Sequence, residues 1–184
     1  KYKEEILKKG WIKDPFAEGN LQAQVHWSGY EFLLGIFLIA GVLLSLWFFR
    51  KEITKLAVGV FVTTLLFTTL TVFIITPKIE GYSQRAAIEF FQSHAGENAY
   101  MEVWAYKSYA PYFYFKQPPP KGNRPTEKQL LTGYINEPVY VVTKNFNAKE
   151  FQKRYPDFSL LYMKNGFAFF GKPAFSTPKN LQQK

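Results

Sequence analysis

Two long apolar runs, neither containing a charged residue, stand in the first half of the chain. They are FLLGIFLIAGVLLSLWFF over residues 32–49 and LAVGVFVTTLLFTTLTVFIIT over residues 56–76. A helix needs roughly 20 apolar residues to cross a hydrocarbon core about 30 Å thick. The pattern therefore predicts a transmembrane helical hairpin over residues 30–76, and every other segment is interpreted relative to a lipid bilayer.

A short basic connector, Arg50 to Lys55, joins the two predicted spans, and three of its six residues are Arg or Lys. Short cytoplasmic loops of membrane proteins carry such an excess. We therefore expect this turn to be cytoplasmic and the segments 1–29 and 77–184 to be extracytoplasmic. The five lysines of residues 1–29 oppose this orientation.

Small and hydroxyl residues lie within both predicted spans. Gly35, Gly41 and Ser45 stand in the first, and six threonines lie between residues 63 and 76. Such residues allow close approach and hydrogen bonds between helices. They predict that the two helices pack against each other or against further spans of a larger protein. Because neither span carries an ionisable side chain, no proton relay or ion path is expected.

Residues 1–29 form a juxtamembrane segment of mixed character. Its first part favours a short helix with i,i+4 ion pairs among Glu4, Glu5, Lys8 and Lys9. The rest predicts a loop at the membrane interface, marked by Trp11, Pro15, Gly19 and Trp27, with Asp14 and Glu18 in a solvated turn. Trp27 and Tyr30 suit an aromatic belt. Because the first span begins only at residue 32, after this segment, we expect a piece of a larger protein.

The pattern changes after Pro77. Apolar residues at helical spacing predict a helix from Ile79 to His94, which Gly96 ends, and the alternation over residues 99–106 predicts a strand. Residues 109–115 favour either a short helix or a second strand. The proline-rich stretch 117–125 predicts a loop.

The C-terminal third alternates between helix and strand signals. Thr126 is a candidate N-cap for the helix EKQLLTG, PVYVVTK over residues 138–144 predicts a strand, and Asn147 is a candidate N-cap for AKEFQKRY. Asn165-Gly166 between SLLYM and FAFFG is a strong hairpin signal. The order predicts a small α/β domain over residues 77–184, with a mixed sheet of three to four strands and flanking helices.

Charge and composition narrow the function classes. The chain has a net charge of +9, and residues 77–184 hold 15 Lys or Arg against 8 Asp or Glu. This excess indicates either solubility alone or attraction to anionic headgroups and phosphorylated ligands. The absence of cysteine excludes disulfides and thiolate sites. No nucleotide-binding, protease or zinc motif occurs, and we expect no shared site between His26 and His94.

Eight aromatic residues fall within the sixteen positions from Tyr100 to Phe115. Such density predicts a core, yet alternation along a strand places some of these rings on the outside. An outer aromatic face with Lys107 and Lys116 would rest on headgroups or stack on sugar rings. Nucleic-acid binding uses the same residue types, but the two predicted spans argue against it.

Several stretches give the chain a resemblance to a known enzyme family. They are IEGYSQRAAIEFFQ, EVWAYKSYAPYFYFKQPPP, PVYVVTK and LLYMKNGFAFF, with KDPFAEGN and VHWSGYEFLLG upstream. In these stretches, which cover nearly the whole chain, it resembles the C-terminal part of bacterial membrane glycosyltransferases of the protein-mannosyltransferase and aminoarabinose-transferase type, in the form found in Bacteroidetes. The likeness is one of sequence texture rather than of a short signature.

The resemblance implies a multi-pass enzyme of the inner membrane that moves a sugar from a polyprenyl-phosphate carrier to an extracytoplasmic acceptor. It implies inverting transfer, in which a carboxylate base activates the acceptor and a divalent metal can assist. The family's catalytic acidic residue lies in an early extracytoplasmic loop that this chain lacks. No catalytic residue, cofactor or metal ligand is therefore assigned here. The expected partners are the bilayer, the lipid-linked donor and further transmembrane helices, but not nucleic acid.

Membrane-proximal residues are the candidates for binding the donor. Lys78 and Arg85 follow the second span by two and nine positions, and a helix beginning near Ile79 would keep Arg85 within roughly 10 Å of its first turn. The planar fork of Arg matches phosphate oxygens, although plain interfacial anchoring is the simpler explanation of both residues. Tyr82, Lys107 and Tyr109 are further candidates. The alternative function is a non-enzymatic, membrane-anchored α/β module that binds a protein, lipid or glycan.

Overall fold

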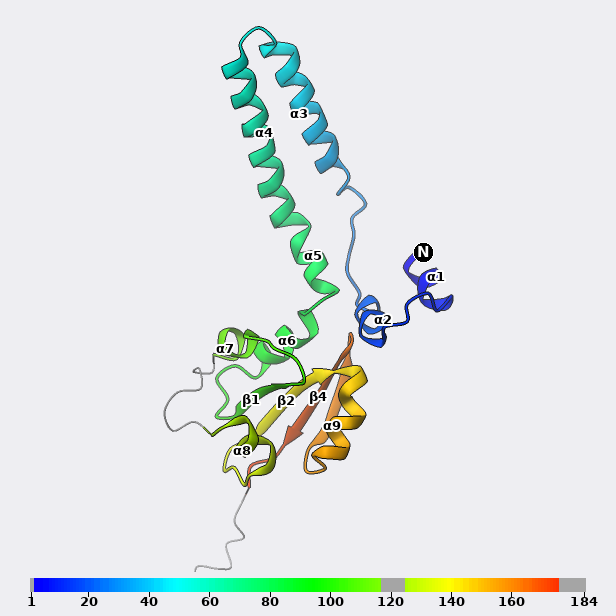
Figure 1. Ribbon diagram of the computed structural model, residues 1–184, viewed down its shortest axis with the longest axis vertical. Coiled ribbons are helices and arrows are strands. Elements are labelled where there is room, and N and C mark those ends of the chain that lie inside the picture. Colours follow the sequence, from blue (N-terminus) through cyan, green and yellow to red (C-terminus); the bar gives the residue numbers. More distant parts are fainter. Residues whose placement is uncertain (1, 117–124, 176–184) are drawn as a thin grey trace, which may run out of the picture. The chain divides into compact units, whose positions relative to one another are not determined.

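The computed structural model describes residues 2–116 and 125–175, and it divides the chain into two compact units (Figure 1). The hairpin unit comprises residues 24–83. The α/β unit comprises residues 1–23 together with residues 84–184. Residues 1–23 of the N-terminal segment thus belong with the C-terminal domain, whereas residues 24–29 belong with the hairpin. The predicted loop 117–125 lies, except for Pro125, outside the described residues.

Two helices, α3 (Leu33–Phe49) and α4 (Ile53–Ile74), pack side by side in the hairpin unit (Figure 1). The helical hairpin predicted from the apolar runs is confirmed. Its connector is shorter than predicted, because Thr54 and Lys55 already lie in the first turn of α4. The Lys55 ammonium lies 2.7 Å from the carboxylate of Glu52, which precedes the helix N-terminus, where a negative charge is favourable.

The prediction of one helix from Ile79 to His94 is wrong. The chain instead forms α5 (Thr76–Gly81) and α6 (Arg85–Ser93), separated by a turn. In this turn the amides of Tyr82 and Ser83 bond to carbonyls three residues back, and this tighter pattern ends the α-helix. Arg85 therefore begins a second helix, and the distance expected along one continuous helix does not apply.

Glycine and hydroxyl residues bring α3 and α4 close together in a reciprocal arrangement. On α3 the Ser45 hydroxyl donates to the Gly41 carbonyl at 2.8 Å, and on α4 the Thr63 hydroxyl donates to the Gly59 carbonyl at 2.9 Å. Each glycine faces the hydroxyl residue of the other helix, and a Cβ on Gly59 would lie 2.8 Å from Ser45 Oγ. The predicted close approach is confirmed at Gly41 and Ser45, whereas Gly35 faces nothing within 4 Å.

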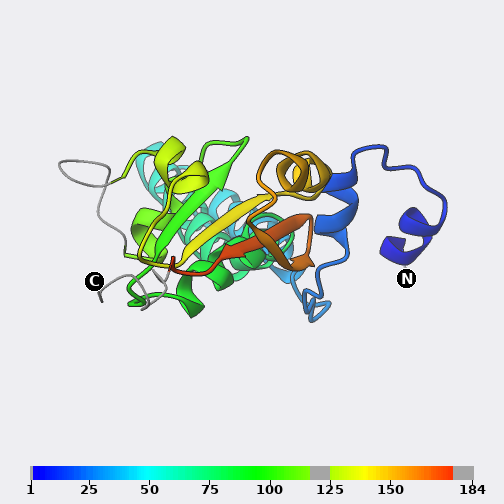
Figure 2. The same cartoon turned by 90° about the horizontal axis from the view of Figure 1, so that it is seen from below.

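A four-stranded mixed sheet forms the centre of the α/β unit, in the order β1-β2-β4-β3. The strands are β1 (Tyr100–Trp104), β2 (Val139–Lys144), β3 (Ser159–Lys164) and β4 (Phe167–Lys172). β1 and β2 are parallel, and the other two pairs are antiparallel. Figure 2 shows β1 in green, β2 in yellow and β4 in red lying side by side. The predicted α/β domain with a mixed sheet is confirmed.

Two apolar clusters lie on the two faces of this sheet. α6 and α7 (Ala110–Tyr114) contribute to the first, whose buried members are Ala86, Ala87, Phe90, Phe91, Met101, Phe115, Val142, Phe167 and Phe169. α8 (Glu127–Thr132) and α9 (Ala148–Arg154) contribute to the second, made of Trp104, Leu130, Leu131, Val139, Val141, Ala148, Phe151, Phe158, Ala168 and Phe170. Alternation along β2 and β4 sends neighbouring side chains into different clusters.

Local capping and turn signals position these elements. Thr126 caps α8 and forms a capping box with Gln129, as its spacing predicts. Asn147 stands at the N-cap of α9 but makes no side-chain capping bond, because it ends a 3-10 turn, η1 (Asn145–Asn147), and has helical backbone angles. Asn165 and Gly166, with φ of 46° and 81°, form the predicted β3–β4 turn.

The N-terminal segment is more ordered than the interfacial loop that its composition predicts. It contains α1 (Tyr2–Lys8) and α2 (Pro15–Leu21). Glu5 of α1 forms the expected ion pair at 2.6 Å with Lys9, the residue after this helix. The predicted loop at Pro15 and Gly19 is wrong, because Asp14 caps this helix by accepting from the Phe16 amide at 2.9 Å. Glu18 accordingly lies on α2 rather than in a solvated turn.

α2 packs against the loop and turn at one end of the sheet. The Asn145 side chain donates to the Pro15 carbonyl at 2.7 Å, and the Phe16 ring meets the Phe167 ring edge-on at 5.1 Å. A Cβ on Gly19 would lie 2.6 Å from the backbone of Gly166, so the two segments touch at their main chains. These contacts explain why residues 1–23 belong to the α/β unit.

Candidate functional site

The densest polar arrangement in the hairpin unit surrounds Glu31, one residue before the first apolar run. We call Trp27, Ser28, Glu31, Lys78 and Tyr82 the Glu31 cluster. The Glu31 carboxylate forms an ion pair with the Lys78 ammonium, and only 12% and 21% of the two side chains are exposed. It also accepts hydrogen bonds at 2.9 Å from the Ser28 amide, the Ser28 hydroxyl and the Gly29 amide.

Aromatic groups complete the Glu31 cluster. The Lys78 ammonium lies 5.3 Å from the centre of the Trp27 ring, a cation–π distance. The indole N–H of Trp27 donates to the Tyr82 hydroxyl at 3.0 Å. These contacts join the segment before α3 to α5, almost fifty residues further along the chain. The cluster therefore fastens the start of the first apolar helix to the end of the second.

The electrostatics of the cluster keep Glu31 ionised. The hydrogen bond from Lys78 holds the pKa of the Glu31 carboxyl well below its usual range, outweighing desolvation, and the amide and hydroxyl donors lower the pKa further. A carboxylate so strongly stabilised is a poor proton acceptor near neutral pH. The contacts of Glu31 therefore indicate a structural role, and its carboxylate largely neutralises the Lys78 charge.

The stability of the hairpin unit is expected to depend on pH through Glu31. Because folding lowers its pKa, its contribution is fully present above the unfolded pKa of about 4.3 and is lost as the pH falls further. The melting temperature of the chain's apolar helices in detergent micelles should stay level from about pH 7 to pH 5.5 and fall below about pH 4. Glu31→Gln should lower the melting temperature between about pH 5.5 and pH 7, and it should make the fall of the melting temperature below about pH 4 less steep.

Glu52 provides the matched control, because its ion pair with Lys55 is more than half exposed. Exposed pairs contribute little to stability, so Glu52→Gln should reproduce the wild-type pH profile. An unchanged fall of the melting temperature at low pH in Glu31→Gln would show that the Glu31–Lys78 pair does not hold the hairpin unit together.

The five predicted donor-binding residues fall in different units. Lys78 and Tyr82 lie in the hairpin unit, and the structure brings both to Trp27. Arg85, the first residue of α6, lies in the α/β unit together with Lys107 and Tyr109, which are exposed just before α7. Glu31 was not predicted from the sequence. The available signal was a lone acidic residue three positions after Ser28, directly before an apolar run.

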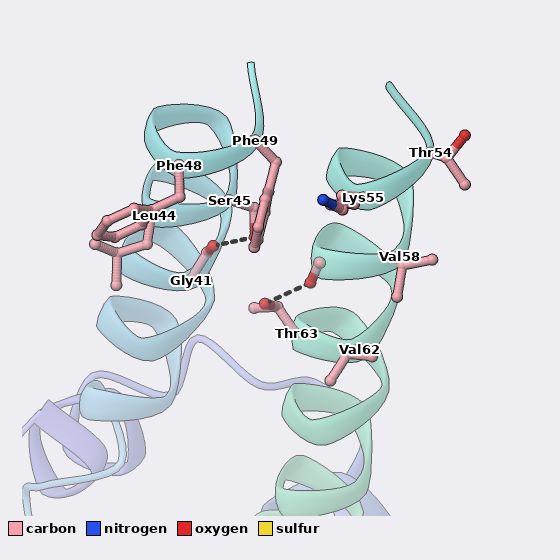
Figure 3. A pocket seen from close by; sticks show the side chains of 11 residues that line it. Gly41, Leu44, Ser45, Phe48, Phe49, Thr54, Lys55, Val58, Val62 and Thr63 are labelled. Atoms are coloured by element: carbon pink, nitrogen blue, oxygen red, sulfur yellow. Dashed lines mark hydrogen bonds between the residues drawn. The ribbon is translucent and has the colours of Figure 1, made fainter. Parts of the chain in front are cut away.

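An open groove runs between α3 and α4 near their connector and has a volume of about 600 Å³ (Figure 3). Its lining is almost entirely apolar and consists of Gly41, Leu44, Ser45, Phe48, Phe49, Thr54, Lys55, Val58, Gly59, Val62 and Thr63. The Ser45 and Thr63 hydroxyls are already bonded within their own helices. Such a lining suits hydrocarbon and offers no acid–base pair for catalysis.

Metal-binding side chains do not converge within residues 2–116 and 125–175, where no three His, Asp or Glu residues form a group that could hold an ion. The divalent metal implied by the resemblance therefore has no ligand set in the described part of the chain. The two histidines lie in different units: His94 in the α/β unit and His26 in the hairpin unit. His94 bonds through Nδ1 to the Phe90 carbonyl at 2.9 Å.

Family models, characterised proteins and solved structures all give no significant match to the chain.

Proposed function

We propose that this chain is the membrane-embedded hairpin and extracytoplasmic α/β unit of a glycosyltransferase that moves a sugar from a polyprenyl-phosphate carrier to an acceptor outside the cytoplasm. The observation that carries the membrane part is the helix from Ile53 to Gly81. It has 29 residues, a mean hydropathy of 2.3 in its most apolar window, and no buried residue in that window. Exposing such a surface to water is unfavourable, so lipid or further apolar helices must cover it.

The length of this helix indicates that a lipid bilayer covers its apolar surface. At 1.5 Å per residue, 29 residues extend about 43 Å, against a hydrocarbon core of about 30 Å. The last turns, which form α5, then reach the headgroup layer. Trp27, Lys78 and Tyr82 are residue types that favour this layer. α3, with 17 residues, runs beside α4 and forms the other half of the hairpin.

The transferase part of the proposal rests on the sequence resemblance. Within it, this chain supplies binding and positioning groups, while the carboxylate base comes from the part of the enzyme outside this chain. Arg85 is the residue assigned to the donor phosphate, because it is an exposed arginine at the start of α6, close in sequence to the end of the apolar helix. A guanidinium binds two phosphate oxygens at once, which orients the carrier as well as attracting it.

Replacement of Arg85 tests this assignment in the full-length enzyme. Arg85→Ala should lower the apparent affinity for the polyprenyl-phosphate sugar by roughly ten-fold or more, the loss expected when a charge-assisted hydrogen bond disappears. Arg85→Lys should not restore it, because an ammonium lacks the planar fork. The measurement is the initial rate of sugar transfer in membranes, as a function of carrier concentration.

Arg154→Ala is the matched control, because Arg154 is an exposed arginine at the end of α9 in the same unit. It should leave the carrier dependence unchanged. Full-length protein that transfers no sugar from any polyprenyl-phosphate donor would refute the enzymatic proposal. Normal kinetics in a well-expressed Arg85→Ala variant would refute only the role of Arg85, leaving interfacial anchoring.

A second function, a membrane-anchored partner-binding module, is favoured by the edge strand β3. All six of its residues are exposed, and four in a row are large and apolar: Leu160, Leu161, Tyr162 and Met163. Exposed apolar edge strands are templates for pairing with another chain. The sugar-transfer assay distinguishes the two functions, because a protein that is only a binding module transfers no sugar at full length.

A further inference from the structure

We propose that the outer face of α7 is a docking surface for the anionic lipid headgroups of the bilayer. We define the α7 face as Lys107, Tyr109, Phe113 and Lys116. The inference rests on the proposed membrane anchoring by the hairpin and extends it to the α/β unit. In this proposal the α/β unit binds the membrane surface through the aromatic and basic α7 face. The alternative is a domain that is connected to the membrane only through the chain after α5.

The first observation is the exposure of large rings on a short helix. Tyr109 is 81% exposed and Phe113 is 76% exposed. They are four residues apart, so they lie on the same side of the helical turn. The opposite side is fixed in the core, where Pro111 and Phe115 are buried. α7 therefore has one buried and one exposed side, and its exposed side carries aromatic residues where a surface helix usually carries charged ones.

The second observation is the charge around these rings. Lys107 and Lys116 are both exposed and flank the helix on either side. From Val103 to Thr126 the sequence contains no Asp or Glu, but it contains four Lys or Arg residues. Aromatic side chains concentrate at the membrane–water boundary, and lysines beside an anionic surface strengthen binding to it. The α7 face combines both properties.

The third observation is the short tether to the apolar helix. Only Tyr82, Ser83 and Gln84 separate α5 from α6, so the two helix ends lie at most roughly 14 Å apart, whatever orientation the unit takes. α7 packs directly against α6 (Figure 1), which is nine residues or about 13 Å long. The length of this connection therefore allows the α7 face to reach the surface that α5 enters.

Lipid is a better fit than a sugar for this surface. A saccharide platform combines an aromatic ring with amide or carboxylate groups that bind hydroxyls in fixed directions. The α7 face carries only aromatic rings, one phenol and two ammonium groups. Stacking on a glycan is therefore an outcome that the experiment must distinguish, not the proposal.

The absence of cysteine allows a direct test in the whole chain. Phe113→Cys and, separately, Tyr109→Cys would be labelled with a nitrobenzoxadiazole probe, and the protein would be reconstituted into vesicles containing lipids with a nitroxide quencher on the acyl chain. Tyr134→Cys is the matched control, because Tyr134 is also 81% exposed and lies in the same unit. Phe61→Cys, in the middle of α4, reports the anchoring itself.

With 30% phosphatidylglycerol in phosphatidylcholine, both α7 probes should be quenched and the Tyr134 probe should not. Replacing Lys107 and Lys116 by Gln should lower the ratio of docked to undocked protein by roughly five-fold for each lysine replaced. Pure phosphatidylcholine or high salt should also lower this ratio, because each weakens the attraction between the lysines and the headgroups. Equal accessibility of the α7 and Tyr134 probes overturns the inference, whatever the Phe61 probe shows. A response to soluble oligosaccharide without lipid quenching also overturns it. An unquenched Phe61 probe, by contrast, refutes the anchoring.

Discussion

Replacing Phe151 by alanine is expected to cost the α/β unit about 3–5 kcal/mol of stability, the range for removing a fully buried aromatic ring. Phe151 is fully buried, and its ring lies 4.6 Å from that of Phe170, 5.3 Å from Trp104 and 5.4 Å from Phe158, measured between centroids. Because domains of this size are stable by only about 5–15 kcal/mol, the variant should be close to unfolding.

Amide hydrogen exchange in β2 measures this loss, because the central strand opens only when the unit unfolds. A cost of 3–5 kcal/mol corresponds to exchange roughly 10² to 10⁴ times faster. The control is Phe146→Ala, since Phe146 is 52% exposed and lies five residues earlier. It should change the exchange rate by less than about ten-fold. Similar rates in the two variants would contradict the core described here.

Replacing Gly41 by leucine is expected to separate α3 from α4, at a cost of about 1–3 kcal/mol. A Cβ at Gly41 would overlap the methyl group of Thr63 on the facing helix. The helices must therefore move apart, or Thr63 must give up its bond to the Gly59 carbonyl. Gly35→Leu is the matched control on the same helix, because nothing lies within 4 Å of Gly35.

Spin labels at exposed positions on the two helices, Leu46 and Phe61, measure the separation in micelles. The distance distribution should lengthen or broaden in Gly41→Leu and remain as in the wild type in Gly35→Leu. Equal distributions in all three proteins would show that the glycine contacts do not set the approach of the helices.

Local signals predicted much of the fold. The uncharged apolar runs defined the hairpin helices, Thr126 marked the start of α8, and Asn165-Gly166 marked the β3–β4 turn, because each depends on residues close in sequence. The N-terminal segment was harder. Pro15 and Gly19 are typical of loops, and α2 is stabilised by contacts with Asn145 and Phe167, which no local pattern reveals.

The candidate site was only partly predictable, for the same reason. Lys78 and Tyr82 stood out as residues just beyond an apolar run, but their partners Glu31 and Trp27 are about fifty residues earlier. The aromatic density from Tyr100 to Phe115 predicted both a core and an outer face. Which rings belong to each depends on α7 being a helix, since the alternative, a strand, would expose a different set.

The most direct test of the account is the labelling of single cysteines in intact bacterial cells with a membrane-impermeant maleimide. Glu150→Cys, exposed on α9, should react from outside, whereas Thr54→Cys, next to the hairpin connector, should react only after the cells are permeabilised. This pattern places residues 30–76 across the bilayer and the α/β unit on the extracytoplasmic side. The reverse pattern would invert the proposed topology, and equal labelling of the two sites from outside would contradict a membrane-spanning hairpin.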